Sequence, residues 1–427
     1  MSRSTLLLAG VWLLVVAGVP ARVRAAAVIR VNDLDHPGEG FNDPTPVAPI
    51  GGNPGVTLGE QRLIAFRYAA NIWGALLDSA VDIRVGAHFD PLMCDASNAI
   101  LGQAGPVTIH RDFAGAPLGA TWYPVALANA LAGRDLSPGK REIQAQFSSS
   151  YGVSCPFPRS WYYGLDAQPG AAQTDFVTVV LHELAHGLGF LTFYNVKTGQ
   201  TLMGRQDAFM RWLEDATTGR LFPDLTPGER VAASVSTDKL QWGGPLVTAA
   251  ATEKTAGVGV GGHVEMYAPP ILEPGSSVVH YSEAVTPDEL MEPFYTGPDR
   301  DLRLTVALLA DVGWAACTTC PTPVPCVTVE ACRAPFAAAL PDPGTATDDA
   351  SRATATRITT LAARVETALD RAAVRSGGAQ RRQYARASRA LRALLAAARE
   401  ADASGTLGVP LGPLAIAGDT LLALLSR

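Results

Sequence analysis

Residues 182–190 read HELAHGLGF, and this run constrains the chain more than any other feature. His182 and His186 are four residues apart, so on an α-helix their imidazoles lie one turn apart on the same face and can bind one zinc ion. Glu183 projects beside them, where its carboxylate can act on a water bound to that ion. The run therefore predicts a zinc-binding helix that also carries a general base.

The neighbouring residues favour a helix at this place. Thr174 and Asp175 are candidate N-caps, because both residue types accept hydrogen bonds from the first free amides of a helix. Apolar residues then recur at helical spacing and predict a buried stripe that holds the ligands; they are Phe176, Val177, Val180, Leu181, Leu184 and Leu188. The alternative is an ordinary core helix whose two histidines have other partners.

Zinc in a catalytic site usually takes three protein ligands and keeps one position for water, so the motif leaves one ligand unassigned. Four other histidines have no supporting motif, and each alone is typical of a surface or packing histidine; they are His36, His88, His110 and His263. His280 differs because residues 288–291, which follow it closely, read DELM. His263 stays as the alternative third ligand.

The HExxHxxG core with a later methionine turn resembles the metzincin metallopeptidases. The compact metzincin pattern has its third histidine three residues after the glycine, and Thr192 occupies that position here. In leishmanolysin-like metzincins, a long insertion separates HExxHxxGF from a third histidine that precedes an ELM turn, and His280 and Met291 match that arrangement. The resemblance covers residues 176–191 and 278–314, extends more weakly over 58–150 and is absent from the tail.

This resemblance implies a site and an activity. The implied ligands of one catalytic Zn²⁺ are His182, His186 and His280. Glu183 would be the general base, Gly189 would let the chain turn after the helix, and Met291 would form a hydrophobic floor beneath the metal. The chain would then be a secreted zinc-dependent metalloendopeptidase, which hydrolyses the peptide bonds of a protein or peptide substrate with a zinc-activated water.

Other interpretations stay open. The chain could be a secreted binding or adhesion protein with a structural or inactive zinc site, in which the tail supplies the main function; an intact Glu183 argues against this. It could also be a zinc hydrolase that acts on a non-peptide bond. Tyr295, four residues after Met291, is a candidate for stabilising an oxyanion, although packing in the core is the more usual role of an aromatic side chain.

The N-terminus predicts export. Arg3 precedes an apolar run over residues 6–19, and small residues follow Pro20, so we expect residues 1–27 to be a signal peptide cleaved near 25–27. The apolar run is short for a membrane span, and an uncleaved anchor is the alternative. We therefore expect a secreted, extracellular or periplasmic protein.

The cysteines fit this location. Six are present and can pair completely in an oxidising compartment; they are Cys94, Cys155, Cys317, Cys320, Cys326 and Cys332. The last four form a C-x2-C-x5-C-x5-C cluster that could be a second zinc site. Export and the lack of a second C-x2-C pair favour disulfides, with three pairings possible in the cluster.

The chain is long enough to bury a sizeable core in two or three units, because 48% of its 427 residues are hydrophobic. An α+β fold is predicted by helices at 58–77 and 302–312, by a helical or loop stretch at 125–131 and by strands at 81–89, 107–113 and 142–147. Together with the resemblance, this pattern predicts a metzincin-like catalytic domain at 28–316, with a twisted sheet and the zinc-binding helix. Residues 196–275 are interpreted as an insertion, with a helix-like stretch at 207–214.

A different composition marks the C-terminal part. Residues 317–348 are rich in Pro and Cys and predict a linker, and residues 349–427 predict an all-α accessory region. Two helices should form a hairpin broken at Gly377 and Gly378, with residues 411–425 packed onto it rather than inserted into a membrane. We expect no stable membrane span after signal cleavage.

Charge excludes one class of partner. The net charge is -6, and residues 333–427 hold 13 Arg against eight acidic residues, a balance of +5 that leaves -11 for the rest. No basic stripe precedes the tail, so nucleic acid is not an expected partner. The asymmetry is typical either of an interaction tail or of a solvated helical surface, and it identifies no partner for the tail.

Overall fold

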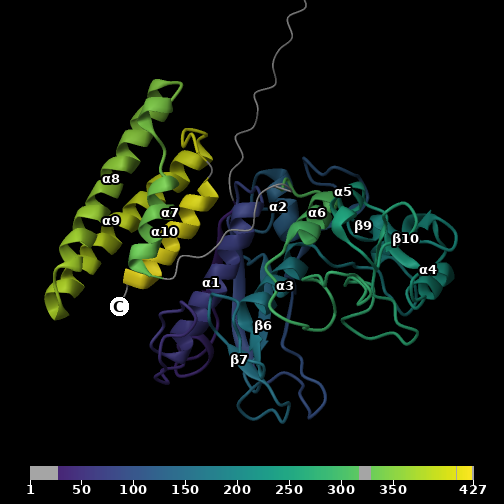
Figure 1. Ribbon diagram of the computed structural model, residues 1–427. Coiled ribbons are helices and arrows are strands. Elements are labelled where there is room, and N and C mark those ends of the chain that lie inside the picture. Colours follow the sequence, from purple (N-terminus) through teal and green to yellow (C-terminus); the bar gives the residue numbers. More distant parts are fainter. Residues whose placement is uncertain (1–26, 317–327, 410, 426–427) are drawn as a thin grey trace, which may run out of the picture.

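A four-stranded sheet organises the first half of the chain, as the computed structural model shows for residues 27–316, 328–409 and 411–425 (Figure 1). The strands lie in the order β1 (Ile29–Asp33), β2 (Ile83–Asp90), β6 (Ile143–Ser148) and β3 (Gly102–Pro106). The first three are parallel, and β3 runs antiparallel to β6 at the edge. Side chains alternate as the strand pattern predicts, since Val85, Ala87 and Phe89 are all buried.

Two helices cover one face of this sheet. The ring of Phe147 on β6 contacts Phe66 of α1 (Leu58–Leu76) and Phe176 of α3 (Phe176–Leu188), with centroid distances of 5.7 and 5.0 Å. The indole nitrogen of Trp73 donates to the Leu181 carbonyl at 3.0 Å and joins the two helices directly. The helix that carries the HExxH run therefore packs beside α1 and against β3 and β6 of the sheet (Figure 1).

Most elements predicted for this part are confirmed. α1 begins at a capping box between Thr57 and Glu60, and α6 (Arg303–Val312) lies where a helix was expected. The strands β2 and β6 also match, and the stretch at 125–131, for which the sequence allows helix or loop, is the helix α2 (Val125–Ala132). The strand predicted at 107–113 is reduced to β4 (Ile109–His110), which joins β5 (Thr121–Pro124) and β9 (Gln206–Asp207) in a small sheet.

The predicted insertion forms a separate layer beyond α3 (Figure 1). Its sheet has the order β11 (Arg220–Leu221), β10 (Leu213–Asp215), β12 (Leu240–Trp242) and β13 (Val264–Glu265), with short helices α4 (Pro227–Ala233) and α5 (Pro245–Ala250). The helix predicted at 207–214 is wrong: this stretch ends β9, makes one 3-10 turn at Met210–Trp212 and enters β10. Its buried residues satisfied a helical pattern, but the backbone pairs with β12 instead.

The C-terminal part is helical. α8 (Asp349–Ala373) and α9 (Gly377–Ala403) form the expected hairpin, and α10 (Leu411–Leu425) packs against α9 and also against α1 (Figure 1). The segment predicted as a linker contains α7 (Val329–Ala338). Its residues Cys332 and Phe336 are buried in one hydrophobic cluster with residues of α8, α9 and α10. The chain has a mixed α+β fold with a C-terminal helical region. No described helix combines the length and hydropathy that a bilayer crossing requires.

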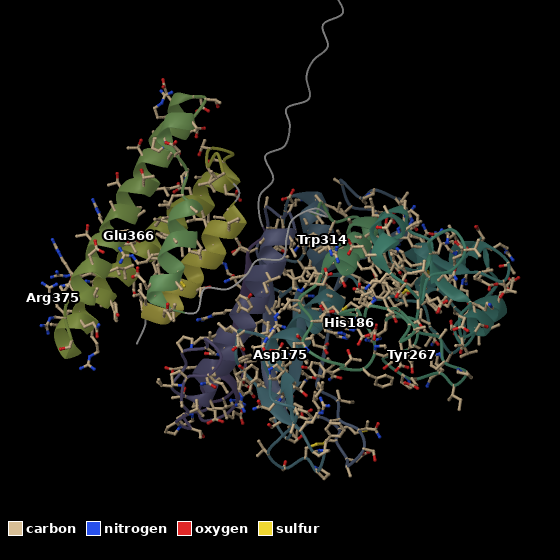
Figure 2. All side chains as sticks on the ribbon, in the orientation of Figure 1. Asp175, His186, Tyr267, Trp314, Glu366 and Arg375 are labelled. Atoms are coloured by element: carbon tan, nitrogen blue, oxygen red, sulfur yellow. A yellow bond between two sulfur atoms is a disulfide. The ribbon has the colours of Figure 1, made fainter. Side chains whose placement is uncertain are left out.

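A disulfide joins the loops that follow two neighbouring strands. Cys94 comes after β2 and Cys155 after β6, and the bond is drawn in yellow in Figure 2. Cys332 is also disulfide-bonded. The predictions for Cys317, Cys320 and Cys326, like the signal peptide predicted at 1–27 with its cleavage near 25–27, fall wholly or almost wholly outside the described residues.

The small parallel pair β7 (Ser160–Tyr162) and β8 (Gln173–Asp175) leads directly into α3. Because β8 ends at Asp175 and α3 begins at the next residue, the start of the helix is fixed by strand pairing as well as by its cap.

Candidate metal centre

Helix α3 presents the HExxH side chains from a buried position. Its N-cap is Asp175, whose carboxylate accepts a hydrogen bond from the Thr178 amide at 2.7 Å. At the other end, Gly189 has a φ of 132°, a conformation that side-chain-bearing residues rarely adopt. The helix therefore stops directly after the turn that carries His186.

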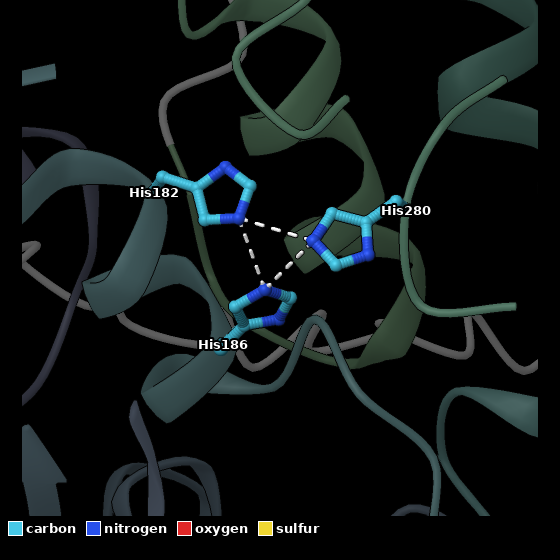
Figure 3. Close-up of side chains that lie close together, drawn as sticks. All are labelled: His182, His186 and His280. Atoms are coloured by element: carbon cyan, nitrogen blue, oxygen red, sulfur yellow. Dashed lines mark hydrogen bonds between the residues drawn. The ribbon is translucent and has the colours of Figure 1, made fainter. Parts of the chain in front are cut away.

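Three imidazoles converge, although one comes from a distant segment (Figure 3). The Nε2 atoms of His182 and His186 are 3.2 Å apart, and the Nε2 atom of His280 lies 3.1 Å from the first and 3.2 Å from the second. Among the described residues, these three form the one group of His, Cys, Asp or Glu side chains with metal-binding spacing.

Backbone carbonyls set the orientation of all three rings. The Nδ1 atom of His182 donates to the Leu290 carbonyl at 2.8 Å, that of His186 to the Phe190 carbonyl at 2.8 Å, and that of His280 to the Ser276 carbonyl at 2.7 Å. A neutral imidazole whose Nδ1 carries the proton has a lone pair on Nε2. Three lone pairs therefore face one another, an arrangement that repels unless a cation lies between them.

The geometry and the electrostatics both suit zinc. Tetrahedral zinc with Zn–N distances of about 2.0–2.1 Å separates two nitrogen ligands by about 3.3 Å, close to the spacing of these Nε2 atoms. Burial lowers the pKa of His182 to about 4 and that of His186 to about 3, and it lowers the pKa of His280 well below its usual value. The rings are therefore held neutral, which is the form that binds metal.

The alternative third ligand lies elsewhere. His263 pairs through Nδ1 with a Glu214 carboxylate oxygen at 3.0 Å, and its side chain is 27% exposed. His88 bonds to Gln144 and Gln146, and His110 bonds to Ser137, so both have local partners. The described structure brings His280, and none of these three, to the HExxH helix.

Glu183 lies in a setting that suits a proton acceptor. Its side chain is buried, and this burial raises the pKa of the carboxyl to about 8, although a hydrogen bond from the Ala104 backbone amide lowers it. An effective general base has a pKa near the working pH. The Ala104 contact also places Glu183 against β3, the edge strand of the sheet.

Gly102 on β3 leaves room for this glutamate. A Cβ atom at Gly102 would lie 2.9 Å from the Glu183 Cγ and 3.0 Å from its Oε1. If Glu183 acts as a general base beside a bound zinc ion, Gly102→Ala should displace its carboxylate and lower kcat by about 10- to 100-fold without changing zinc stoichiometry, because a small misplacement of a reacting group is costly. Gly105→Ala on the same strand is the matched control, since its Cβ would meet nothing within 4 Å. Equal rates for both variants would contradict this role of Gly102.

Met291 and Tyr295, which both follow His280 in the sequence, lie in different surroundings. Met291 is fully buried, and the carbonyl of its neighbour Leu290 accepts the hydrogen bond from His182. The hydroxyl of Tyr295 accepts a hydrogen bond from the Asp175 backbone amide at 3.0 Å, at the N-terminus of α3 and about two turns from His182. This contact favours the packing role of Tyr295 over a role at an oxyanion.

Thr192, which stands where the compact metzincin pattern has histidine, anchors the chain after α3. Its hydroxyl donates to the Asp207 carboxylate at 2.8 Å. The same carboxylate accepts bonds from three backbone amides, those of Phe193, Phe209 and Met210, at 2.7–3.0 Å. Asp207 thus fixes the start of the insertion, a role that its sequence position did not reveal.

We expect Asp207→Ala to destabilise the fold by about 3 kcal/mol or more, because four donors would lose their acceptor in a buried place. Urea denaturation followed by circular dichroism would measure the free energy of unfolding. Asp215→Ala is the control, since its carboxylate accepts bonds from Thr217 and Thr218 near the surface and its loss should cost less than about 1 kcal/mol. Similar losses in both variants would count against Asp207 as an anchor.

Comparison with known proteins adds a partial match. A family model described as SPBPB7E8-like matches residues 139–238, which include α3 with His182, Glu183 and His186 but end before His280. No curated protein and no solved structure matches the chain.

Proposed function

We propose that this protein is a secreted zinc-dependent metalloendopeptidase with a metzincin-like catalytic domain of the leishmanolysin arrangement. The observation that carries the proposal is the convergence of three Nε2 lone pairs from His182, His186 and His280, two of them on the helix that also carries the buried carboxyl of Glu183. A purely structural zinc site has four protein ligands, whereas three ligands leave a position for water. The disulfide between Cys94 and Cys155 supports an oxidising location.

The roles of the residues follow from their chemistry. Zinc, when bound, acidifies a water and polarises the scissile carbonyl. Glu183 would accept a proton as the water oxygen bonds to the carbonyl carbon, and would then deliver it to the leaving amine nitrogen. The peptide C–N bond breaks without a covalent bond between the chain and its substrate.

The edge strand favours a peptide as substrate. β3 is the last strand of its sheet in the described part of the chain, so one side of its backbone has no strand partner. An extended peptide can pair with such an edge through main-chain hydrogen bonds. Because β3 contacts Glu183 through Ala104, a peptide bound there would lie beside the proton acceptor.

The test is zinc content and proteolysis measured on the same preparation. We expect the purified secreted chain to bind one Zn²⁺ and to degrade casein, with activity lost to a chelator and restored by Zn²⁺. Zinc binding without cleavage of casein or of a peptide library would favour the non-peptide hydrolase or a binding protein. No zinc binding in metal-replete buffer would overturn the proposed site.

A further inference from the structure

A segment that follows the third histidine runs back along the zinc-binding helix. This strap, residues 289–301, contacts α3 near His182 through the Leu290 carbonyl and near the start of the helix through the amide of Asp299, which donates to the Thr178 hydroxyl at 3.0 Å. Its contacts therefore cover the stretch of α3 that precedes the ligands.

A buried ion pair attaches the C-terminal end of the strap to α3. The Arg300 guanidinium donates through Nη1 to the Asp175 carboxylate at 2.6 Å, and the side chain of Asp175 is fully buried while that of Arg300 is 19% exposed. The same Asp175 oxygen accepts bonds from the amide and the hydroxyl of Thr178, both at 2.7 Å. One carboxylate oxygen thus joins the cap of α3 to the strap.

We propose that Arg300 is a positioning residue for the metal centre. The bond between Arg300 and Asp175 fixes the strap against α3, and the strap in turn presents the Leu290 carbonyl to Nδ1 of His182. The partner of a ligand's second nitrogen sets the orientation of the ring and tunes metal affinity. This inference rests on the proposed zinc site and adds a residue to it that does not touch the metal ligands.

Arg300 is suited to this role by its chemistry. A guanidinium carries a permanent charge and a planar array of donors, so it can hold a buried carboxylate in one direction. Removing one member of a buried pair leaves the other charge uncompensated, which loosens the surrounding structure. The strap connects this pair to Leu290 over ten residues. Between these two points, the hydroxyl of Thr178 on α3 accepts a hydrogen bond from the amide of Asp299 in the strap.

The test measures metal binding rather than hydrolysis. Arg300→Met, Arg300→Lys and Arg303→Met would be loaded with Co²⁺, and the visible absorption spectrum and the dissociation constant from chelator competition would be recorded. We expect Arg300→Met to weaken metal binding by about 10- to 100-fold and to alter the spectrum, and Arg300→Lys to recover part of the loss. Arg303→Met should match the wild type, because Arg303 is exposed and pairs with the exposed carboxylates of Asp301 and Glu253 rather than with the Asp175 cap of α3.

If Arg300→Met fails to fold, a second variant still tests the proposal. The double variant Asp175→Asn/Arg300→Met removes both charges and keeps a capping side chain, so it should fold and still bind metal more weakly. A folded variant that lacks the pair but keeps the wild-type spectrum and dissociation constant would overturn the role of Arg300. Failure of the wild type itself to bind metal would instead overturn the zinc site on which this inference rests.

Discussion

Glu183→Gln should retain zinc and lose about 10²- to 10⁴-fold in the rate of peptide hydrolysis, because the amide cannot accept the proton that a general base removes. Glutamine has nearly the same size, and the three Nε2 atoms that define the metal centre belong to His182, His186 and His280, so the substitution removes none of them. Zinc per chain, measured by atomic absorption, and initial rates on a fluorogenic peptide would separate binding from turnover.

The matched control for this substitution is Glu265→Gln. Glu265 is a partly buried glutamate whose pKa is also raised by burial, but it lies on β13 in the insertion. Its variant should hydrolyse the peptide at the wild-type rate. A Glu183→Gln protein with an unchanged rate would show that Glu183 is not the base, and one that loses zinc would show that its role is structural.

Local patterns predicted the part of the site that lies on one helix. The proposed ligands His182 and His186 are brought together by four residues of helical backbone, and the cap at Asp175 and the stop at Gly189 are short-range signals. α1 was predictable for the same reason, since its capping box and apolar repeat involve neighbouring residues. Such signals need no knowledge of the rest of the fold.

The remaining parts depend on contacts between distant segments. His280 could be assigned from the sequence only through a resemblance, because 94 residues separate it from His186 and the folding of the insertion brings it back. The carbonyls that orient the three rings carry no side-chain signal at all. β3 was missed because its residues GQAGP lack apolar alternation, and its place follows from pairing with β6.

The structural roles of two charged residues could not be predicted from the sequence for a related reason. Asp207 and Arg300 resemble surface residues in the sequence, and only the tertiary structure shows that one gathers four donors and the other reaches the cap of α3. The helix wrongly predicted at 207–214 has the same origin, since its apolar residues are buried on strands and a 3-10 turn rather than on one helical face.

His280→Ala should weaken zinc binding by more than about 100-fold, because the loss of a direct ligand exceeds the 10- to 100-fold effect of removing an outer partner. Two imidazoles on one turn of α3 would remain, and the third Nε2, which lies 3.1 Å and 3.2 Å from theirs, would be gone. His263→Ala is the matched control, because that ring pairs with Glu214 and should leave affinity unchanged. Competition with a chromogenic chelator would measure both constants. If His263→Ala lost zinc and His280→Ala kept it, the third ligand would have to be His263, and the insertion would have to adopt a different path around the metal.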